Sequence, residues 1–268
     1  MVYLKTDEEI ELLRHSSLLV SKTLAEVAKH IKEGVFYSAL DKIAEQFILD
    51  NNAVPAFKGY RGFPGSLCIS PNNQVVHGLP SETPVQNGDI LSIDCGILSN
   101  NFYGDSAFTF AVGDISENSK KLLEVTKTSL YLAIEKSVVG NRVGDISNAV
   151  QSYCESFGFG VVRELVGHGV GKALHEEPEV PNFGKKGSGV LLKKGMVIAI
   201  EPMINEGGQH VKFYNDGWTV KTKDLKMSAH FEHTVAIGEE KADVLSDFKI
   251  IEAEIIKNSN LNNSYIIN

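Results

Sequence analysis

The chain has 268 residues, of which 43% are hydrophobic and 22% are charged, and these proportions are typical of a globular protein. They exclude a chain that is disordered throughout and a fibrous repeat. The net charge of −8 and the absence of an apolar run of about 20 residues argue against a basic nucleic-acid-binding face, a polybasic membrane anchor and a membrane span.

The first third of the sequence predicts two helices followed by a structured loop. Thr6 and Glu9 have the spacing of a capping box, and apolar residues then recur at helical intervals over 10–31. A second helix is expected at 38–49. The stretch 51–71 is rich in glycine, proline and aromatic residues, and we expect it to form a structured loop.

Strands and helices are both expected in the rest of the chain. Apolar runs predict strands at 74–76, 90–94, 103–112, 197–204, 219–221 and 233–237. A long helix is expected at about 118–138 and a shorter one at about 146–157. The segment that starts at Lys257 contains several asparagines and is expected to be frayed.

Two strand-like segments resemble each other. GDILSID ends at Asp94, and GMVIAIE ends 107 residues later at Glu201. The same offset carries the helix that follows Gly34 onto the helix that follows Asn141. The sequence therefore predicts two pseudo-repeated halves, although two unrelated buried strands would give the same pattern.

Four acidic residues lie in or beside apolar strands. Asp94 and Glu201 end the two segments above, Asp105 lies in FYGDSAFTF, and Glu232 lies in HFEHTVAI. One such acid alone would be read as ion-paired or exposed at a strand edge. Because a buried carboxylate without a partner is costly and few basic residues are near these four in sequence, a pair of divalent cations is the simplest partner.

Three histidines are candidates for the same site. His168 lies between glycines in LVGHGVGKALHEEP, and His175 follows seven residues later. Carboxylate and imidazole ligands without thiolate suit Mn, Fe, Co or Zn. His77 precedes a Gly-Leu-Pro turn near the aromatic loop; a loop histidine of this kind is more often a surface residue, and its position near the loop favours a function.

Together with their neighbouring residues, these acids and histidines form segments that resemble the type I methionine aminopeptidases, which share the pita-bread fold with prolidases and creatinases. The resemblance runs from about residue 5 to about residue 250. The segments that carry it, in the order of the family, are GYRGFPGSLCIS, NNQVVHGLP, GDILSIDCGIL, YGDSAFTF, GHGVGKALHEEP, GMVIAIEPMI, DGWTVKTKD and HFEHTV.

The resemblance implies an α+β pita-bread fold, in which a pseudo-twofold antiparallel sheet is flanked by helices. It implies one catalytic domain over 1–250, with pseudo-repeats at about 35–112 and 142–237. The tail 251–268 lies largely beyond the resemblance, and its end is expected to be disordered.

The resemblance also implies a centre of two divalent metal ions (Co, Mn, Fe or Zn) and their ligands. Asp105 and Glu232 would bridge the ions, Asp94 would bind one of them, and His168 and Glu201 would bind the other. A water or hydroxide that bridges the ions would attack the first peptide bond of a chain that begins with methionine.

Further roles follow from the same resemblance. Glu201 would transfer the proton of the water, His175 would stabilise the tetrahedral oxyanion, and His77 would contact the scissile amide. The methionine side chain would lie in an apolar pocket, for which ordinary core packing is the alternative; its expected residues are Tyr60, Phe63, Cys68, Leu174, Trp218 and, nearby, Phe57.

Two positions depart from the pattern of the family. Leu174 stands where phenylalanine is common, so the edge of the pocket is expected to be roomier. Gly96 stands where some relatives carry a hydroxyl that helps to bind the substrate amine.

The expected setting is a monomer in the cytoplasm that acts on nascent polypeptides at the ribosome, without nucleic-acid specificity and without membrane association. The N-terminus lacks the apolar region of a signal peptide, and the three cysteines are far apart and odd in number. A prolidase or aminopeptidase P is one alternative, but such enzymes usually carry a large domain before the first ligand. A metal-free pita-bread binding protein is another, but such proteins typically lack some of the five ligands.

Overall fold

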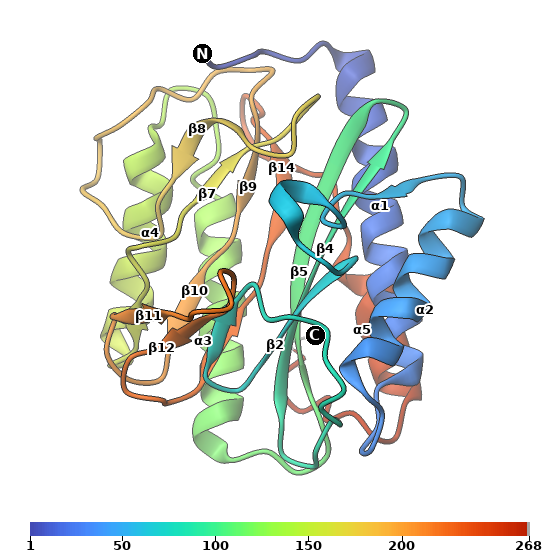
Figure 1. The fold of residues 1–268 in the computed structure, drawn as a ribbon. Coiled ribbons are helices and arrows are strands. Elements are labelled where there is room, and N and C mark those ends of the chain that lie inside the picture. Colours follow the sequence, from blue (N-terminus) through green and yellow to red (C-terminus); the bar gives the residue numbers. More distant parts are fainter. Residues whose placement is uncertain (267–268) are drawn as a thin grey trace.

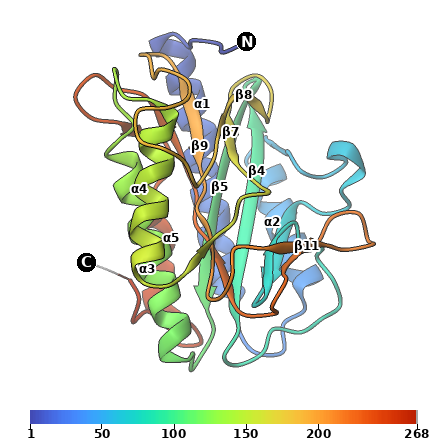
Figure 2. The same ribbon diagram turned by 90° about the vertical axis from the view of Figure 1, so that its left-hand side faces the viewer.

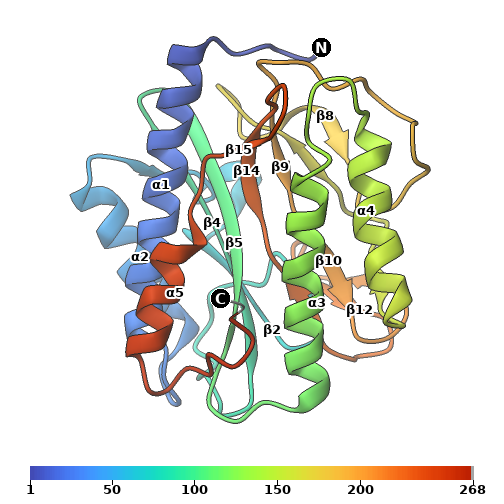
Figure 3. The same cartoon turned by 180° about the vertical axis from the view of Figure 1, so that it is seen from behind.

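The computed structural model describes residues 1–266, in which the α-helices cover one face of a group of antiparallel sheets (Figure 1). Seen from behind, α1 and α5 cover one half of the strands, and α3 and α4 cover the other (Figure 3). The helices are α1 (Asp7–His30), α2 (Tyr37–Asp50), α3 (Glu117–Ile134), α4 (Val143–Ser156) and α5 (Phe248–Lys257).

The helix boundaries follow local signals in the sequence. The Thr6 side chain accepts a hydrogen bond from the N–H of Glu9, and the Glu9 carboxylate accepts one from the N–H of Thr6, which completes the predicted capping box of α1. Ser116 caps α3 by accepting a hydrogen bond from the N–H of Ser119. Within residues 1–266, no helix is long and apolar enough to cross a membrane.

The strands form four sheets. A long hairpin of β4 and β5 extends a sheet of order β1-β4-β2, and a second sheet has the order β15-β14-β9-β7-β8. Two sheets of three strands have the orders β13-β10-β6 and β11-β12-β3. The strands are β1 (Val54–Pro55), β2 (Leu67–Pro71), β3 (Gln74–Val76), β4 (Ile90–Ser99), β5 (Phe102–Ala111), β6 (Gly160–Val161), β7 (Gly167–Gly169), β8 (Glu176–Val180), β9 (Val197–Ile200), β10 (Met203–Asn205), β11 (Val211–Phe213), β12 (Val220–Thr222), β13 (Ser228–His230), β14 (His233–Ala236) and β15 (Asp243–Val244).

Two strand predictions need correction. The strand expected at 197–204 is interrupted after Ile200, because Pro202 has no N–H to donate to a neighbouring strand. The stretch 51–71 is not entirely loop: it contains β1, a short 3₁₀ turn at Tyr60–Gly62 and the buried strand β2. Glycine and proline in this stretch hide the apolar run that forms β2.

The segment after Lys257 is folded, in contrast to the frayed segment expected from its asparagines. Tyr265 is fully buried, and its hydroxyl donates a hydrogen bond to the Thr109 carbonyl at 3.0 Å. The Asn262 amide donates to the Gly113 carbonyl at 3.1 Å. These partners on and beside β5 are far away in sequence, so local composition does not reveal them. The disorder expected at the very end of the chain falls on residues 267–268, which lie outside the described part.

The helices leave the opposite face of the strands available for a site. In the side view, α3 and α4 lie on one side of β9, and β11 lies on the other (Figure 2). The apolar side chains between helices and strands form one large core, which includes Leu24, Ile93, Phe108 and Phe231. This core supports β4, β5 and β9, the strands in or next to which three of the four acids lie.

Candidate metal centre and substrate pocket

The β4–β5 hairpin places Asp94 and Asp105 on one face. Gly96 lies directly opposite Asp105 in the register of the hairpin. Because side chains two residues apart in a strand point the same way, Asp94 shares the face of Gly96 and therefore that of Asp105. The two carboxylates are diagonal neighbours on this face.

Backbone hydrogen bonds bring Glu232 to the same hairpin. The N–H of Glu232 donates to the Ala107 carbonyl at 2.9 Å, and the Ser106 hydroxyl donates to the Glu232 carbonyl at 2.6 Å. His233, the next residue, pairs with Ile200 at one end of the antiparallel pairing of β14 and β9. Glu232 and Glu201 are the next residues beyond that pair, so they lie beside each other. The two halves of the chain therefore contribute two acids each to one place.

His168 faces the acids from β7. Its Nδ1 lies 2.9 Å from the Gly169 carbonyl, so in the neutral ring Nδ1–H donates there and Nε2 carries a free lone pair. This Nε2 lies 3.8 Å from Asp105 Oδ2 and 3.6 Å from Glu201 Oε1. Donor atoms of Asp105, His168 and Glu232 all lie within 4.8 Å of one another, and this spacing could hold a metal ion.

The residues present fit a divalent cation. In the described part of the chain, one oxygen each of Asp94, Asp105 and Glu232 is buried without a hydrogen-bond partner. Burial raises the pKa of Asp94 to about 7 and that of Glu201 to about 8. The pKa values of Asp105 and Glu232 are also well above their usual range, because burial and the neighbouring carboxylates disfavour their charge. A divalent cation would remove this penalty by pairing with the negative charge.

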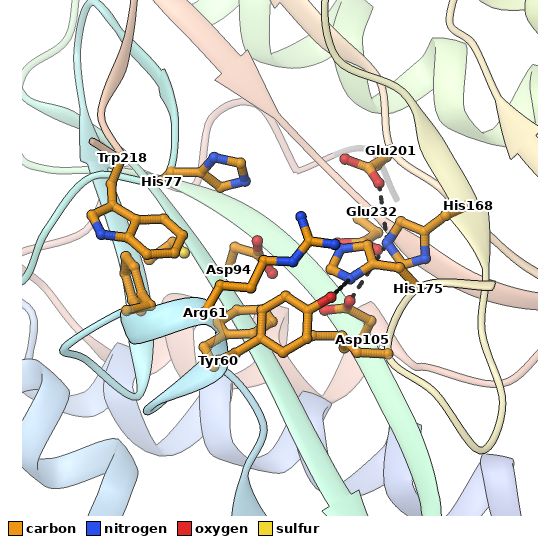
Figure 4. A pocket seen from close by; sticks show the side chains of 14 residues that line it. Tyr60, Arg61, His77, Asp94, Asp105, His168, His175, Glu201, Trp218 and Glu232 are labelled. Carbon is orange, nitrogen blue, oxygen red and sulfur yellow. Dashed lines mark hydrogen bonds and ion pairs between the residues drawn. The ribbon is translucent and has the colours of Figure 1, made fainter. Parts of the chain in front are cut away.

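A cavity of about 720 Å³, including its open mouth, lies over these acids (Figure 4). It brings together every candidate site residue predicted from the sequence. Its lining is Phe57, Tyr60, Phe63, Cys68, His77, Asp94, Asp105, His168, Leu174, His175, Glu201, Trp218 and Glu232, together with Arg61.

One wall of the cavity is apolar. The rings of Phe63 and Trp218 meet edge to face with centroids 5.1 Å apart. Phe57, Cys68 and Leu174 pack with Phe63 in one buried cluster. Cys68 lies opposite Asp94 in the β2–β4 register, so the apolar wall begins directly beside the acids.

Two histidines lie at the other walls. His77 has a left-handed backbone with φ of 58°, and its pKa is lowered to about 4 by burial and by His230 and His175. The pKa of His175 is lowered by loss of solvent and by the neighbouring charges of His168 and Arg61. Both rings are therefore neutral at neutral pH, and each can donate one hydrogen bond.

Sequence reasoning missed Arg61. Its side chain lines the cavity, its guanidinium carbon lies 5.5 Å from the Tyr60 ring centroid, and its φ is 48°. The only signal in the sequence is its position inside GYRGFP, between two residues of the pocket wall. An arginine in a glycine-rich loop is usually a surface residue, so this position alone does not indicate a site.

Carboxylates and an imidazole that converge from antiparallel strands are a donor set for divalent metal ions. The chain belongs to metallopeptidase family M24, whose sequence pattern matches residues 11–239. This confirms the family expected from the sequence motifs.

Within the family, the chain is similar to proteins named methionine aminopeptidase. It is 50% identical to the one of Clostridium perfringens, over 93% of this chain and 100% of that relative. It is also 50% identical to methionine aminopeptidase 1 of Bacillus subtilis, over 92% of this chain and 99% of that relative.

Solved structures show the same fold. Methionine aminopeptidase from Rickettsia prowazekii superposes with a TM-score of 0.91 at 37% identity, over 92% of this chain and 100% of that one. Prolidase from Pyrococcus furiosus superposes with a TM-score of 0.75 at 25% identity, over 91% of this chain and 65% of that one. The expected pita-bread fold is confirmed.

Proposed function

We propose that the protein removes the N-terminal methionine of nascent polypeptides by hydrolysing the first peptide bond at a centre of two divalent metal ions. The observation that carries this proposal is a set of four carboxylates beside an apolar pocket: Asp105 and Glu232 are buried, Asp94 and Glu201 are partly buried, and three of the four have a buried oxygen without a partner among the described residues. The relatives named methionine aminopeptidase support the same reaction.

The ligands in this proposal are Asp94, Asp105, His168, Glu201 and Glu232. Their four carboxylates carry the charge that two divalent ions would neutralise, and a neutral imidazole leaves that balance unchanged. Oxygen and nitrogen donors suit Co, Mn, Fe or Zn. When bound, such ions acidify water and polarise the carbonyl of a substrate.

Three side chains of the cavity act on the reacting groups in this proposal. Glu201 accepts the proton of the attacking water. Among the described residues, the nitrogens close to its carboxylate belong to His168 and His230 and not to a lysine or arginine that would hold it in the charged form. His175 donates a hydrogen bond to the carbonyl oxygen as that oxygen gains charge. His77, on the opposite wall, contacts the scissile amide and supports the departing nitrogen.

The methionine side chain occupies the apolar wall in this proposal. Contacts between a thioether and aromatic rings are worth about 0.3–1.5 kcal/mol each, and Phe63 and Trp218 present such rings. Leu174 and Cys68 complete a wall that suits an unbranched side chain.

The proposal also includes the cellular setting: a monomer in the cytoplasm that meets nascent chains at the ribosome. Cys68, Cys95 and Cys154 are buried free thiols, which supports a reducing compartment.

The test is hydrolysis of the peptide Met-Ala-Ser, with Leu-Ala-Ser and the dipeptide Ala-Pro as matched substrates. We expect methionine release from the first peptide only, complete loss of activity after chelation, and recovery on addition of Mn or Co. Cleavage of Ala-Pro alone would indicate a prolidase. Activity that survives exhaustive chelation, or no cleavage by metal-loaded protein, would overturn the proposal.

A further inference from the structure

His230 is a buried histidine that the proposed mechanism does not use. It is the last residue of β13, only 2% of its surface is exposed, and it does not line the cavity. In the described part of the chain, its Nε2 is buried without a hydrogen-bond partner. A buried donor or acceptor without a partner destabilises the fold, so this atom calls for an explanation.

The backbone of His230 is held firmly at this place. Its N–H donates to the Thr109 hydroxyl oxygen at 3.0 Å, and the Thr109 hydroxyl donates to the His230 carbonyl at 2.6 Å. Thr109 lies on β5 on the same face as Asp105, four residues along the strand. The backbone of His230 is therefore fixed beside the strand that carries one of the acids.

The Glu201 carboxylate approaches this nitrogen. His230 Nε2 lies 3.6 Å from Glu201 Oε2, and His168 Nε2 lies 3.6 Å from Glu201 Oε1. The two oxygens of one carboxylate therefore face different histidines. The nitrogen of His168 is a bare acceptor, because its Nδ1–H is used by the Gly169 carbonyl.

His168 and His230 thus suit different roles. His168 presents a nitrogen lone pair beside Oε1, and a cation bound to that lone pair would also be near Oε1. When Glu201 is ionised, as a metal ligand would be, a second bare nitrogen beside Oε2 would leave two buried acceptors facing each other, whereas an N–H would give both atoms a partner.

We propose that His230 is a positioning residue for Glu201, with Nε2–H donating a hydrogen bond to Oε2 and leaving Oε1 to the metal side. This inference rests on the proposed function, in which Glu201 is both a ligand and a proton acceptor. By fixing the carboxylate plane, His230 assigns these two tasks to different oxygens. Oε2 keeps a second lone pair that can accept the proton of the attacking water.

The direct test reads the tautomer of His230 by ¹⁵N NMR in the intact protein loaded with zinc, which is diamagnetic, with H230Q used to assign the signal. We expect a neutral ring with the hydrogen on Nε2. A hydrogen on Nδ1, or direct coordination of the metal by His230, would overturn the proposal. This readout needs no substrate, so it remains decisive even if the wild-type protein fails to cleave Met-Ala-Ser.

Variants provide the second test. His230→Leu removes the donor, and we expect kcat to fall about 10–100-fold with little change in KM, together with faster loss of metal to a chelator. His230→Gln can place an amide N–H near the same point and is expected to retain kcat within about threefold of wild type.

The matched control is His233→Gln. This neighbouring histidine is also buried, but it does not line the cavity. Its ring stacks on that of Phe248 with centroids 3.7 Å apart, and its Nδ1 lies 2.6 Å from the Ser246 hydroxyl. Its substitution should change Tm and leave kcat and metal retention unchanged. Equal loss of kcat in H230Q and H230L, or unchanged kcat and metal retention in a folded H230L, would overturn the positioning role.

Discussion

The hydroxyl of Tyr60 lies 2.9 Å from Nδ1 of His175, and this contact links the loop of the apolar wall to the proposed oxyanion donor. The two rings are tilted by 34° with centroids 5.3 Å apart. When the neutral ring accepts the Tyr60 hydrogen at Nδ1, its own hydrogen must be on Nε2. By donating to Nδ1, the Tyr60 hydroxyl would support the tautomer that leaves a donor on Nε2.

This relationship predicts that Tyr60→Phe lowers kcat about tenfold and leaves KM for Met-Ala-Ser nearly unchanged. The aromatic ring remains in the pocket wall, whereas the group that fixes the His175 tautomer is lost. His175→Ala should cost more, about 10²–10³ in kcat, because the oxyanion donor itself is removed. In the double variant, Tyr60→Phe should add nothing further. Additive losses in steady-state kinetics would show that Tyr60 acts independently of His175.

The cluster of acids predicts that Asp94→Asn removes turnover and lowers the bound metal without unfolding the chain. An amide is a neutral and weaker ligand than a carboxylate, and its loss of charge relieves a burial penalty in the metal-free protein. Metal content by elemental analysis, activity and circular dichroism test this together.

Asp41→Asn is the matched control for this substitution. Asp41 is also buried, but its carboxylate accepts hydrogen bonds from the N–H groups of Ser66 and Leu67, both at 2.8 Å. We expect lower stability and an unchanged metal content. Full activity of Asp94→Asn would contradict the assignment of Asp94 as a ligand.

The raised pKa values predict how the stability of the metal-free protein depends on pH. Burial raises the pKa of Glu201 from 4.5 to about 8 and that of Asp94 from 3.8 to about 7. The folded protein then binds more protons than the unfolded chain, so the contribution of these groups to stability is fully present below about pH 4 and is lost progressively as pH rises to about 8.

We therefore expect the Tm of metal-free protein to fall by about 5–10 °C between about pH 6 and pH 9, and metal affinity to rise over the same range. Metal-loaded protein should not show this fall, because the cation replaces the protons. The double variant Asp94→Asn, Glu201→Gln should make the curve of the metal-free protein less steep, with Asp105 and Glu232 supplying the pH dependence that remains. Scanning calorimetry at several pH values measures this, and a Tm that rises with pH in the metal-free wild type would contradict it.

The acids of the site could be predicted from the sequence because a carboxylate inside an apolar strand breaks the ordinary pattern of burial. Asp94, Asp105, Glu201 and Glu232 all carry that signal. The role of Tyr265 could not be predicted, since its partner, the Thr109 carbonyl, is 156 residues away and a run of asparagines precedes it. Local composition indicates flexibility there, whereas a long-range hydrogen bond and full burial determine the outcome.

The contact of His230 with Glu201 was hidden for a similar reason. The strand predicted there covers only 233–237, whereas the structure has a separate strand β13 that ends at His230 and pairs with β10. The pairing of β13 with β10 joins segments distant in sequence, so the sequence does not indicate that His230 lies near Glu201. The motifs could predict which residues form the site. The role of each residue depends on distances between side-chain atoms, which the sequence does not contain.

Gly96 and Phe57 form a coupled pair that predicts a last set of variants. A Cβ at Gly96 would lie 2.5 Å from Cε1 of Phe57, so the Phe57 ring occupies the space that a larger residue would need. Gly96→Ala should therefore push this ring into the cavity, raise KM for Met-Ala-Ser about tenfold and destabilise the fold by about 1–3 kcal/mol. Phe57→Ala in the same chain should recover most of the KM increase, because it returns the space. Gly208→Ala is the control, since its Cβ would meet only Asp224 Oδ2 at 3.8 Å. Peptide kinetics of the single and double variants measure the coupling, and an unchanged KM in Gly96→Ala would show that Phe57 moves aside without cost to the pocket.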